Sequence, residues 1–235
     1  MVRVGGPRGL LAMLGSARSV LLQSALPAPM AAYSFSEGSG LTTVDSSTHG
    51  RTLTLNATTW TTGHTGFGIT NTTTGQGATG SFIGPADTLT IMAWIRPLNL
   101  AAGTTHFALG FVDSSANTQV GIFTQRADFG TSDVLQADIR IGGSLKELHG
   151  TALTLNTWTH IALTYNGSII YLYKDGVLVT SLAATGNIGT GDAFYVAGWS
   201  TVAPYDTDVD IDDVRVFSTA LTQGQVIIGM NTPVT

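Results

Sequence analysis

The sequence predicts an all-β fold, a two-sheet antiparallel β-sandwich of the jelly-roll kind, preceded by a separate N-terminal arm. Gly (29 residues) and Thr (36 residues) make up more than a quarter of the 235-residue chain, whereas charged residues make up 11%. Both are poor helix formers, and Thr fits the half-buried surface of a strand. In addition, short apolar segments alternate with turn signals from residue 31 onward, as in sandwiches and barrels.

Residues 1–30 differ chemically from the rest of the chain. They contain three Arg and no acidic residue, a charge of +3, which leaves −8 on residues 31–235 because the whole chain carries −5. Apolar residues recur at three- and four-residue spacings from Leu10 to Ala25. This pattern predicts one amphipathic helix.

A cleavable secretory signal is the alternative interpretation of the arm. We favour a retained arm, because Arg18 interrupts the apolar stretch and no clean small-x-small cleavage site precedes Tyr33. An isolated helix of this length is only marginally stable in water. We therefore expect the arm to dock on a partner subunit, within an oligomer or a larger complex.

The clearest strand signals form a three-strand meander. Its strands are Thr159–Tyr165, Ser168–Tyr173 and Val177–Ser181, and they are joined by Asn166-Gly167 and Asp175-Gly176. These two dipeptides supply the positive φ angles of tight hairpin turns. The sequence therefore predicts consecutive antiparallel strands here.

Further strands follow from the same signals, and about ten strands imply two stacked sheets. The predicted segments are Thr52–Leu55, Leu89–Ile95, Phe107–Phe111, Val120–Phe123, Leu135–Ile141, Phe194–Trp199 and Asp210–Phe217. Thr70–Gly80 is polar, interrupted by Gly and without period. It is predicted to be a loop or a strand edge.

Composition argues against several classes of protein. The pI is near 5.3, and the chain has only two Lys, so we expect no nucleic-acid partner, since such proteins show clustered basic residues. No apolar run approaches the ~18 residues of a membrane helix, and we expect no membrane span. Without Cys there is no disulfide, thiolate metal site or cysteine nucleophile.

Five segments carry a resemblance to a known family: AAYSFSEGSGLTTVDSS (31–47), ATTWTTG (57–63), LTIMAWIRP (89–97), LNTWTHIALTYNGSIIYLYKDGVLV (155–179) and VDIDDVRVFSTALTQGQV (209–226). In order and spacing they resemble the LamG-like jelly-roll modules of the concanavalin A-like lectin/glucanase superfamily, which are laminin G-like or pentraxin-like β-sandwiches. The resemblance implies a sandwich domain over residues 31–235, used in binding or adhesion and often holding a structural calcium ion. It does not name a ligand.

The resemblance places the family's acidic positions on Asp45 and Asp212. Strand alternation puts Asp210 and Asp212 on the same face as Val214 and Val216. A carboxylate at the rim of the sandwich needs compensation, which Ca²⁺ supplies. Asp45, Asp210 and Asp212 are therefore the predicted calcium ligands.

The alternative to this calcium site is a solvated acidic loop. Residues 66–80, where many relatives carry an Asp-rich segment, contain no acidic residue. This departure from the family pattern weakens the calcium prediction.

Catalytic residues are not predicted. Glycosidases need two carboxylates a few ångströms apart, and in this superfamily they commonly form an E-x-D-x-x-E strand motif. The chain has only Glu37 and Glu147, far apart in sequence. Its five His residues lack metal-ligand spacing, and no G-x-S-x-G or phosphate-loop motif is present. We predict a protein that is not an enzyme.

Sugar recognition commonly combines an exposed aromatic ring with polar groups. Trp94 and Trp158 lie in strand motifs and are predicted to be core residues. Trp199 opens the segment WSTVAPYD, with Tyr205 and Asp206 close by. These three are the predicted ligand-binding residues, and the alternative is that Trp199 caps the sandwich beneath its own loop.

The favoured function is that of a non-catalytic structural and recognition subunit, namely a bacteriophage virion protein of the minor-tail or surface-decoration kind. Its lectin-like module would bind host-surface carbohydrate, and residues 1–30 would contact other virion or assembly proteins. The expected location is the virion surface or the extracellular space. A secreted bacterial glycan-binding or adhesion module with a cleavable signal is the alternative, and a glucanase-like hydrolase is less favoured.

Overall fold

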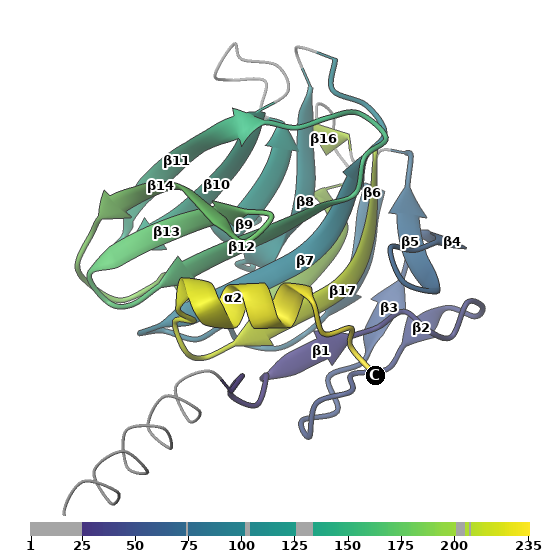
Figure 1. Ribbon diagram of the computed structural model, residues 1–235, viewed down its shortest axis with the longest axis horizontal. Coiled ribbons are helices and arrows are strands. Elements are labelled where there is room, and N and C mark those ends of the chain that lie inside the picture. Colours follow the sequence, from purple (N-terminus) through teal and green to yellow (C-terminus); the bar gives the residue numbers. More distant parts are fainter. Residues whose placement is uncertain (1–24, 74, 102–103, 126–133, 201–204, 207) are drawn as a thin grey trace, which may run out of the picture.

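The computed structural model describes residues 25–235 except 74, 102–103, 126–133, 201–204 and 207. The helix predicted for the arm falls almost entirely within residues 1–24 and so lies outside the described residues. The described chain forms two β-sheets that face each other as a sandwich (Figure 1). The predicted all-β sandwich is confirmed.

Sheet 1 has eight strands in the order β14-β13-β12-β7-β17-β5-β4, with β1 also paired to β17. All of its pairs are antiparallel. The bounds are β1 Ala31–Tyr33, β4 Thr59–Thr62, β5 Phe67–Asn71, β7 Leu89–Pro97, β12 Thr159–Tyr165, β13 Ile169–Lys174, β14 Val177–Ala183 and β17 Val209–Phe217. The predicted meander is β12, β13 and β14.

Sheet 2 has nine strands in the order β11-β10-β9-β8-β15-β6-β3-β2, and β16 pairs with β8 in parallel. Its bounds are β2 Thr42–Thr43, β3 Leu53–Leu55, β6 Gly75–Gly80, β8 Thr105–Val112, β9 Thr118–Gln125, β10 Val134–Ile141, β11 Ser144–Ala152, β15 Ala193–Ser200 and β16 Tyr205–Asp206. Each strand predicted from the sequence coincides with an observed strand to within two residues at either end.

Strand alternation separates the core from the two outer faces. In β10, Leu135, Ala137 and Ile139 belong to the core cluster between the sheets, and in β12 Ile161 and Leu163 do the same. The residues between them face outward, because successive side chains of a strand point to opposite sides. Each sheet therefore has one apolar inner face and one outer face that is free to carry polar groups.

A short helix that the sequence analysis missed covers part of sheet 1. α2, Gln223–Met230, begins with a capping box in which Thr222 and Gln225 bond each other's backbone N–H groups. Val226 of this helix packs with Met92 and Phe217 on the outer face of sheet 1, where Figure 1 shows the helix in yellow. No helix in the described part of the chain is long and apolar enough to cross a membrane.

The prediction for Thr70–Gly80 as a loop or strand edge is wrong for most of the segment. β6 spans Gly75–Gly80 and lies inside sheet 2, between β15 and β3. A Cβ atom on Gly77 would overlap the carbonyl oxygen of Val196 in β15. The Gly residues therefore permit a close approach of neighbouring strands.

The predicted face of Asp212 is also wrong. Val209, Ile211, Val214 and Val216 all belong to the core cluster. Between Asp212 and Arg215 the register with β7 shifts, and Asp213 adopts a φ of 51°. This β-bulge adds one residue to β17, so the strand carries Asp212 on the outer face although Val214 and Val216 point into the core.

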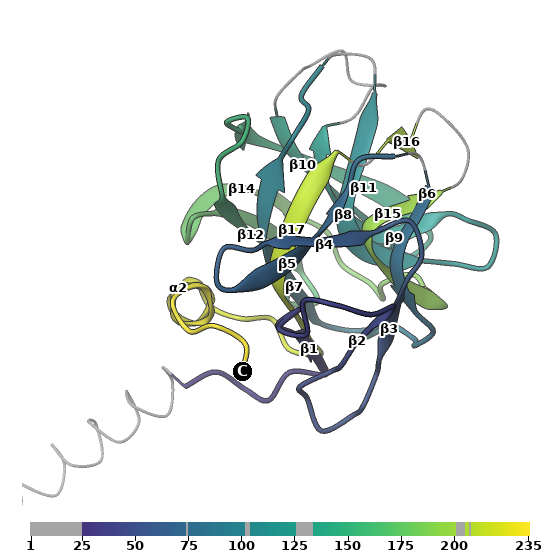
Figure 2. The same cartoon turned by 90° about the vertical axis from the view of Figure 1, so that its right-hand side faces the viewer.

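Trp94 and Trp158, predicted to be core residues, lie instead on the outer side of sheet 1. Trp94 is half-buried beneath the ring of His64, with ring centroids 3.6 Å apart and 9° between the planes. His64 belongs to the turn between β4 and β5, the hairpin that faces the viewer in Figure 2. Trp158 contacts the edge of His64 and lies 5.2 Å from the guanidinium of Arg96.

Asp212 of β17 holds the turn between β4 and β5 in place. Its Oδ2 accepts a hydrogen bond of 2.9 Å from the backbone N–H of Thr65. Burial raises the pKa of Asp212 to about 7, and the neighbouring carboxylate of Asp213 adds to the rise, while hydrogen bonds from Thr65 and Asp213 oppose it. Burial lowers the pKa of His160 in β12 to about 3, helped by the positive charge of Arg215.

Replacing Gly77 by Ala should destabilise the domain by about 2 kcal/mol or more, because the added methyl group forces β6 and β15 apart. Gly224 in α2 provides a matched control, since a Cβ there meets nothing within 4 Å. Gly224→Ala should stabilise the protein by about 0.5 to 1 kcal/mol through helix propensity. Urea unfolding of both variants checks this, and equal effects would contradict the packing argument.

Replacing Asp212 by Asn should raise the unfolding temperature relative to the wild type by an amount that grows from pH 5 to pH 8. The pKa of Asp212 is about 7 in the folded protein, against an ordinary value of 3.8. Its contribution to stability is therefore fully present below about pH 3.8 and is lost as the pH rises through about 7. The opposite effect of His160, whose stabilisation is lost as the pH falls below 6.5, is common to both proteins and cancels.

Thermal unfolding by circular dichroism at several pH values measures this difference. Asp210→Asn is the control, because it removes the ion pair with Arg96 and should lower the unfolding temperature instead of raising it. A difference between Asp212→Asn and the wild type that stays constant with pH would show that Asp212 does not titrate in this way.

Candidate functional site

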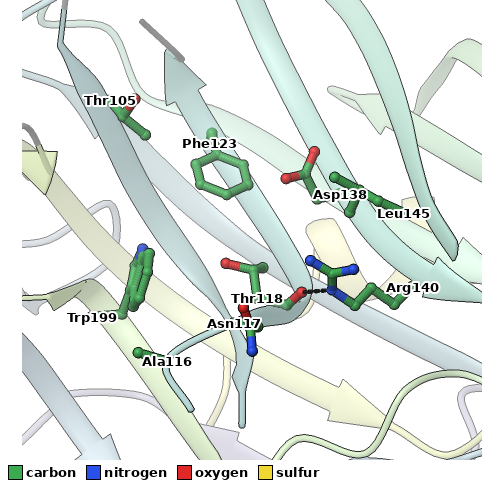
Figure 3. A pocket seen from close by; sticks show the side chains of 9 residues that line it. All are labelled: Thr105, Ala116, Asn117, Thr118, Phe123, Asp138, Arg140, Leu145 and Trp199. Atoms are coloured by element: carbon green, nitrogen blue, oxygen red, sulfur yellow. Dashed lines mark hydrogen bonds between the residues drawn. The ribbon is translucent and has the colours of Figure 1, made fainter. Parts of the chain in front are cut away.

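A small pocket of about 170 Å³ opens on the outer face of sheet 2 (Figure 3). It extends across neighbouring strands, from β15 through β8, β9 and β10 to β11. The lining residues are Thr105, Ala116, Asn117, Thr118, Phe123, Asp138, Arg140, Leu145 and Trp199.

One wall of the pocket is aromatic. Trp199 from β15 and Phe123 from β9 both line it, and Phe107 lies between them. Phe107 meets Phe123 edge to face at 5.3 Å between centroids and Trp199 at 6.2 Å. Edge-to-face contacts of this kind fix ring orientation, so the indole of Trp199 is supported by buried rings from two other strands.

The opposite wall is polar. Leu135, Ala137 and Ile139 are buried in the core, so alternation turns Asp138 and Arg140 outward into the pocket. The Nε of Arg140 donates to the carbonyl oxygen of Thr118 at 3.2 Å, which holds the guanidinium toward the pocket, as Figure 3 shows. Asp138 is 3% exposed.

A tight turn between β8 and β9 completes the pocket and presents Asn117. The carboxylate of Asp113 accepts hydrogen bonds from the backbone N–H groups of Ser115 and Asn117 and from the side chain of Gln119. Burial acts to raise the pKa of Asp113, but hydrogen bonds from Asn117 and Ser115 and the charge of Arg140 outweigh it and lower the pKa. The turn is therefore fixed by an ionised aspartate.

Of the three predicted ligand-binding residues, the structure brings Trp199 to this pocket. The backbone of β16, which contains Tyr205 and Asp206, pairs in parallel with Thr105 and His106 of β8. It therefore runs beside a strand that lines the pocket. The side chains of Tyr205 and Asp206 lie outside what the structure describes.

The three predicted calcium ligands have protein partners. Both carboxylate oxygens of Asp45 accept hydrogen bonds, from the backbone of Ala32, Ser47 and Arg51 and from the Ser47 hydroxyl, at 2.7 to 2.9 Å. Burial acts to raise the pKa of Asp45, yet these bonds lower it. Its charge is thus already compensated without a cation.

The other two predicted calcium ligands, Asp210 and Asp212, also bond to groups of the protein. One oxygen of Asp210 contacts Nε and Nη2 of Arg96 at 2.7 and 2.5 Å, and Asp212 holds the hairpin turn. Among the described residues, no group of three or more His, Asp or Glu side chains could hold a metal ion. These residues do not fit a shared calcium site, and calcium binding stays a prediction.

Sequence reasoning missed most of the pocket. Phe123, Asp138 and Arg140 lie in strands that were predicted, and their outward positions follow from the alternation with Leu135, Ala137 and Ile139. The signal was therefore present in β10. Which outward residues of five strands would meet around Trp199 depends on strand order, and one sequence does not contain that information.

Comparison with known proteins agrees with this architecture. A family model described as the concanavalin A-like lectin/glucanases superfamily matches residues 70–227, which are 158 of the 235 residues. No curated protein sequence matches the chain.

Solved structures with the same fold include several binding domains. The binding domain of Paraclostridial Mosquitocidal Protein 1 is 14% identical at a TM-score of 0.68, with 86% of this chain and 52% of that chain covered. The ligand-binding domain of botulinum neurotoxin serotype D, solved with N-acetylneuraminic acid, is 13% identical at a TM-score of 0.67, with 86% and 50% covered. This chain therefore spans about half the length of the toxin domains.

A third neighbour has nearly the same extent as this chain. Domain 4 of an extracellular arabinanase from Geobacillus stearothermophilus, solved with arabinotriose, is 22% identical at a TM-score of 0.61, with 86% of this chain and 97% of that domain covered. At such identities the likeness shows the fold alone. The family match over two thirds of the chain, together with the observed sandwich, shows that the chain belongs to the concanavalin A-like lectin/glucanase superfamily.

Proposed function

We propose that this chain is a non-catalytic carbohydrate-binding domain whose ligand occupies the pocket around Trp199. The observation that carries the proposal is the division of the pocket into an indole wall and a wall formed by Asp138 and Arg140. A sugar ring has apolar C–H faces, which stack on aromatic rings, and hydroxyl groups, which bond to carboxylates and guanidinium groups. The two walls match these two parts of a sugar.

The structural neighbours support the ligand class. The arabinanase domain was solved with arabinotriose and the neurotoxin domain with N-acetylneuraminic acid. Both ligands are carbohydrates, although one is neutral and the other acidic. For this chain we take from them the class and not the particular sugar.

We further propose that the domain is a recognition subunit of a larger assembly, with a phage virion as the favoured setting at a virion surface. The end of the arm supports an attachment role. The carbonyl of Ala25 accepts a hydrogen bond from Gln225 of α2, and Leu26 packs against the cluster on the outer face of sheet 1. Ala25 and Leu26 therefore lie on the side of the domain opposite the pocket.

A hydrolase is the second candidate, favoured by one observation. Asp138 and Glu147 are Cα partners across β10 and β11, so a carboxylate pair lies beside the pocket although the sequence separates the two residues. Retaining glycosidases use carboxyl groups about 5 Å apart. Release of new reducing ends from a bound oligosaccharide would favour this candidate over binding alone.

Replacing Trp199 by Ala should weaken carbohydrate binding by at least about tenfold, because the loss of a stacked indole costs on the order of 1.4 kcal/mol. A glycan array followed by calorimetry with the best ligand, with arabinotriose and N-acetylneuraminic acid included, measures the effect. Trp158→Ala is the control, since Trp158 is a half-buried Trp on the outer side of sheet 1. Equal losses in both variants, or no binding by the wild type, would contradict the proposal.

The native protein should retain residues 1–30. Intact-mass spectrometry of protein from its natural source distinguishes a subunit of a larger assembly from a secreted module. An assembly arm stays attached, whereas a secretory signal is removed. A mature chain that begins near residue 30 would favour the secreted glycan-binding module.

A further inference from the structure

We infer that the ligand is a glycoside whose sugar lies in the pocket around Trp199 and whose alkyl aglycone lies in a leucine-lined groove next to that pocket. The inference rests on the proposed function and adds a class of ligand to it. Three features carry it: the chemistry of the groove, its fixed walls and its place beside the pocket.

The groove has the size and the lining of a site for an apolar group. Its volume is about 480 Å³, within the range of ~300 to 1,000 Å³ that is usual for ligand sites. Four Leu, one Ala, one Asn and one Thr line it, from residues 98–101 and 153–155, and none of these seven residues carries a charge. Burial of apolar groups is favourable without any specific partner, so an uncharged alkyl chain fits this lining.

The groove continues the hydrophobic core outward. Residues 98–101 follow β7 of sheet 1, and residues 153–155 follow β11 of sheet 2, so both segments pass from one sheet to the other. Leu153 belongs to the core cluster, and Leu100 packs against that cluster. Leu155 is 46% exposed. An alkyl chain in the groove would therefore rest on the core and cover Leu155.

The walls of the groove are held in place by hydrogen bonds. The N–H of Leu98 donates to the carbonyl oxygen of Asp208 at 2.8 Å, and the side-chain amide of Asn99 donates to the carboxylate of Asp208 at 2.9 Å. The N–H of Asn156 donates to the carbonyl oxygen of Pro97 at 2.8 Å, which joins one wall to the other. A site that is already ordered binds its ligand with little loss of conformational entropy.

Ala101 connects the groove to the sugar pocket. Its carbonyl oxygen accepts hydrogen bonds from Nε2 of Gln125 and, at 3.1 Å, from the hydroxyl of Thr104. Gln125 lies two positions after Phe123 in β9, roughly 7 Å along a strand, and Thr104 directly precedes Thr105. Both Phe123 and Thr105 line the pocket. One ligand can therefore occupy the pocket with its sugar and the groove with its aglycone.

A series of alkyl glycosides tests the inference. Calorimetry of the full chain uses the methyl, butyl and octyl glycosides of galactose, glucose and arabinose, each below the concentration at which it forms micelles. Affinity should rise from the methyl to the octyl compound by at least about thirtyfold, because each buried methylene group strengthens binding by up to about fourfold. The heat-capacity change of binding should be more negative for the octyl compound, as expected for apolar burial.

Two leucine variants locate the alkyl chain. Leu155→Asp should remove most of the gain of the octyl over the methyl glycoside and leave the affinity for the methyl glycoside unchanged. Leu178→Asp is the matched control, since Leu178 in β14 is 42% exposed and lies outside both the groove and the pocket, and it should keep the gain. Trp199→Ala should weaken the methyl and octyl glycosides by the same factor.

The outcomes separate the inference from the proposed function. Equal affinities for methyl and octyl glycosides, or an octyl gain that survives Leu155→Asp, would overturn the inference while binding that depends on Trp199 upholds the function. Binding of glycans on an array without binding of any octyl glycoside would have the same meaning. Octyl binding that is insensitive to Trp199→Ala would refute a single ligand in both sites. Failure of every glycoside and of the glycan array would overturn both proposals.

Discussion

Burial of every second residue in the strands is the constraint on which the rest of this structure depends. Each sheet must present one apolar face to the other, because the free energy of folding comes chiefly from that contact. Residues on the two outer faces do not have to be apolar. In β10 the inward Leu135, Ala137 and Ile139 hold the strand in place, and the outward positions carry Asp138 and Arg140 at no cost to the core.

Among the register shifts of the described strands, two contain a non-glycine residue at positive φ, and both lie where the surface carries unusual groups. In β15 the register shifts between Val196 and Trp199, with Ala197 at a φ of 56°. In β17 it shifts beside Asp213, at a φ of 51°. Positive φ angles are uncommon for residues with a Cβ atom, and bulges often accompany functional positions. One bulge precedes the indole of the pocket, and the other exposes Asp212 to the β4–β5 hairpin turn.

These bulges explain how far the sequence could be interpreted. Turn dipeptides such as Asn166-Gly167 and runs such as Leu135–Ile141 identify strands because their signals are local. The face of Asp212 could not be predicted, since neither Asp212 nor Asp213 has a residue type that marks a bulge. Trp94 was misplaced for a related reason: it occupies an outward position in a strand whose neighbours Ala93 and Ile95 are buried, and the cover that His64 provides comes from a distant hairpin.

The C-terminal segment is fastened to the middle of sheet 1. The carbonyl oxygens of Gly229 and Thr232 accept hydrogen bonds from Arg215, and the N–H of Val234 donates to Asp213 at 2.7 Å. The chain end is thus held on the layer remote from Trp199. A short, stiff linker from the last residue to a sensor surface would consequently present the Trp199 pocket toward the solution.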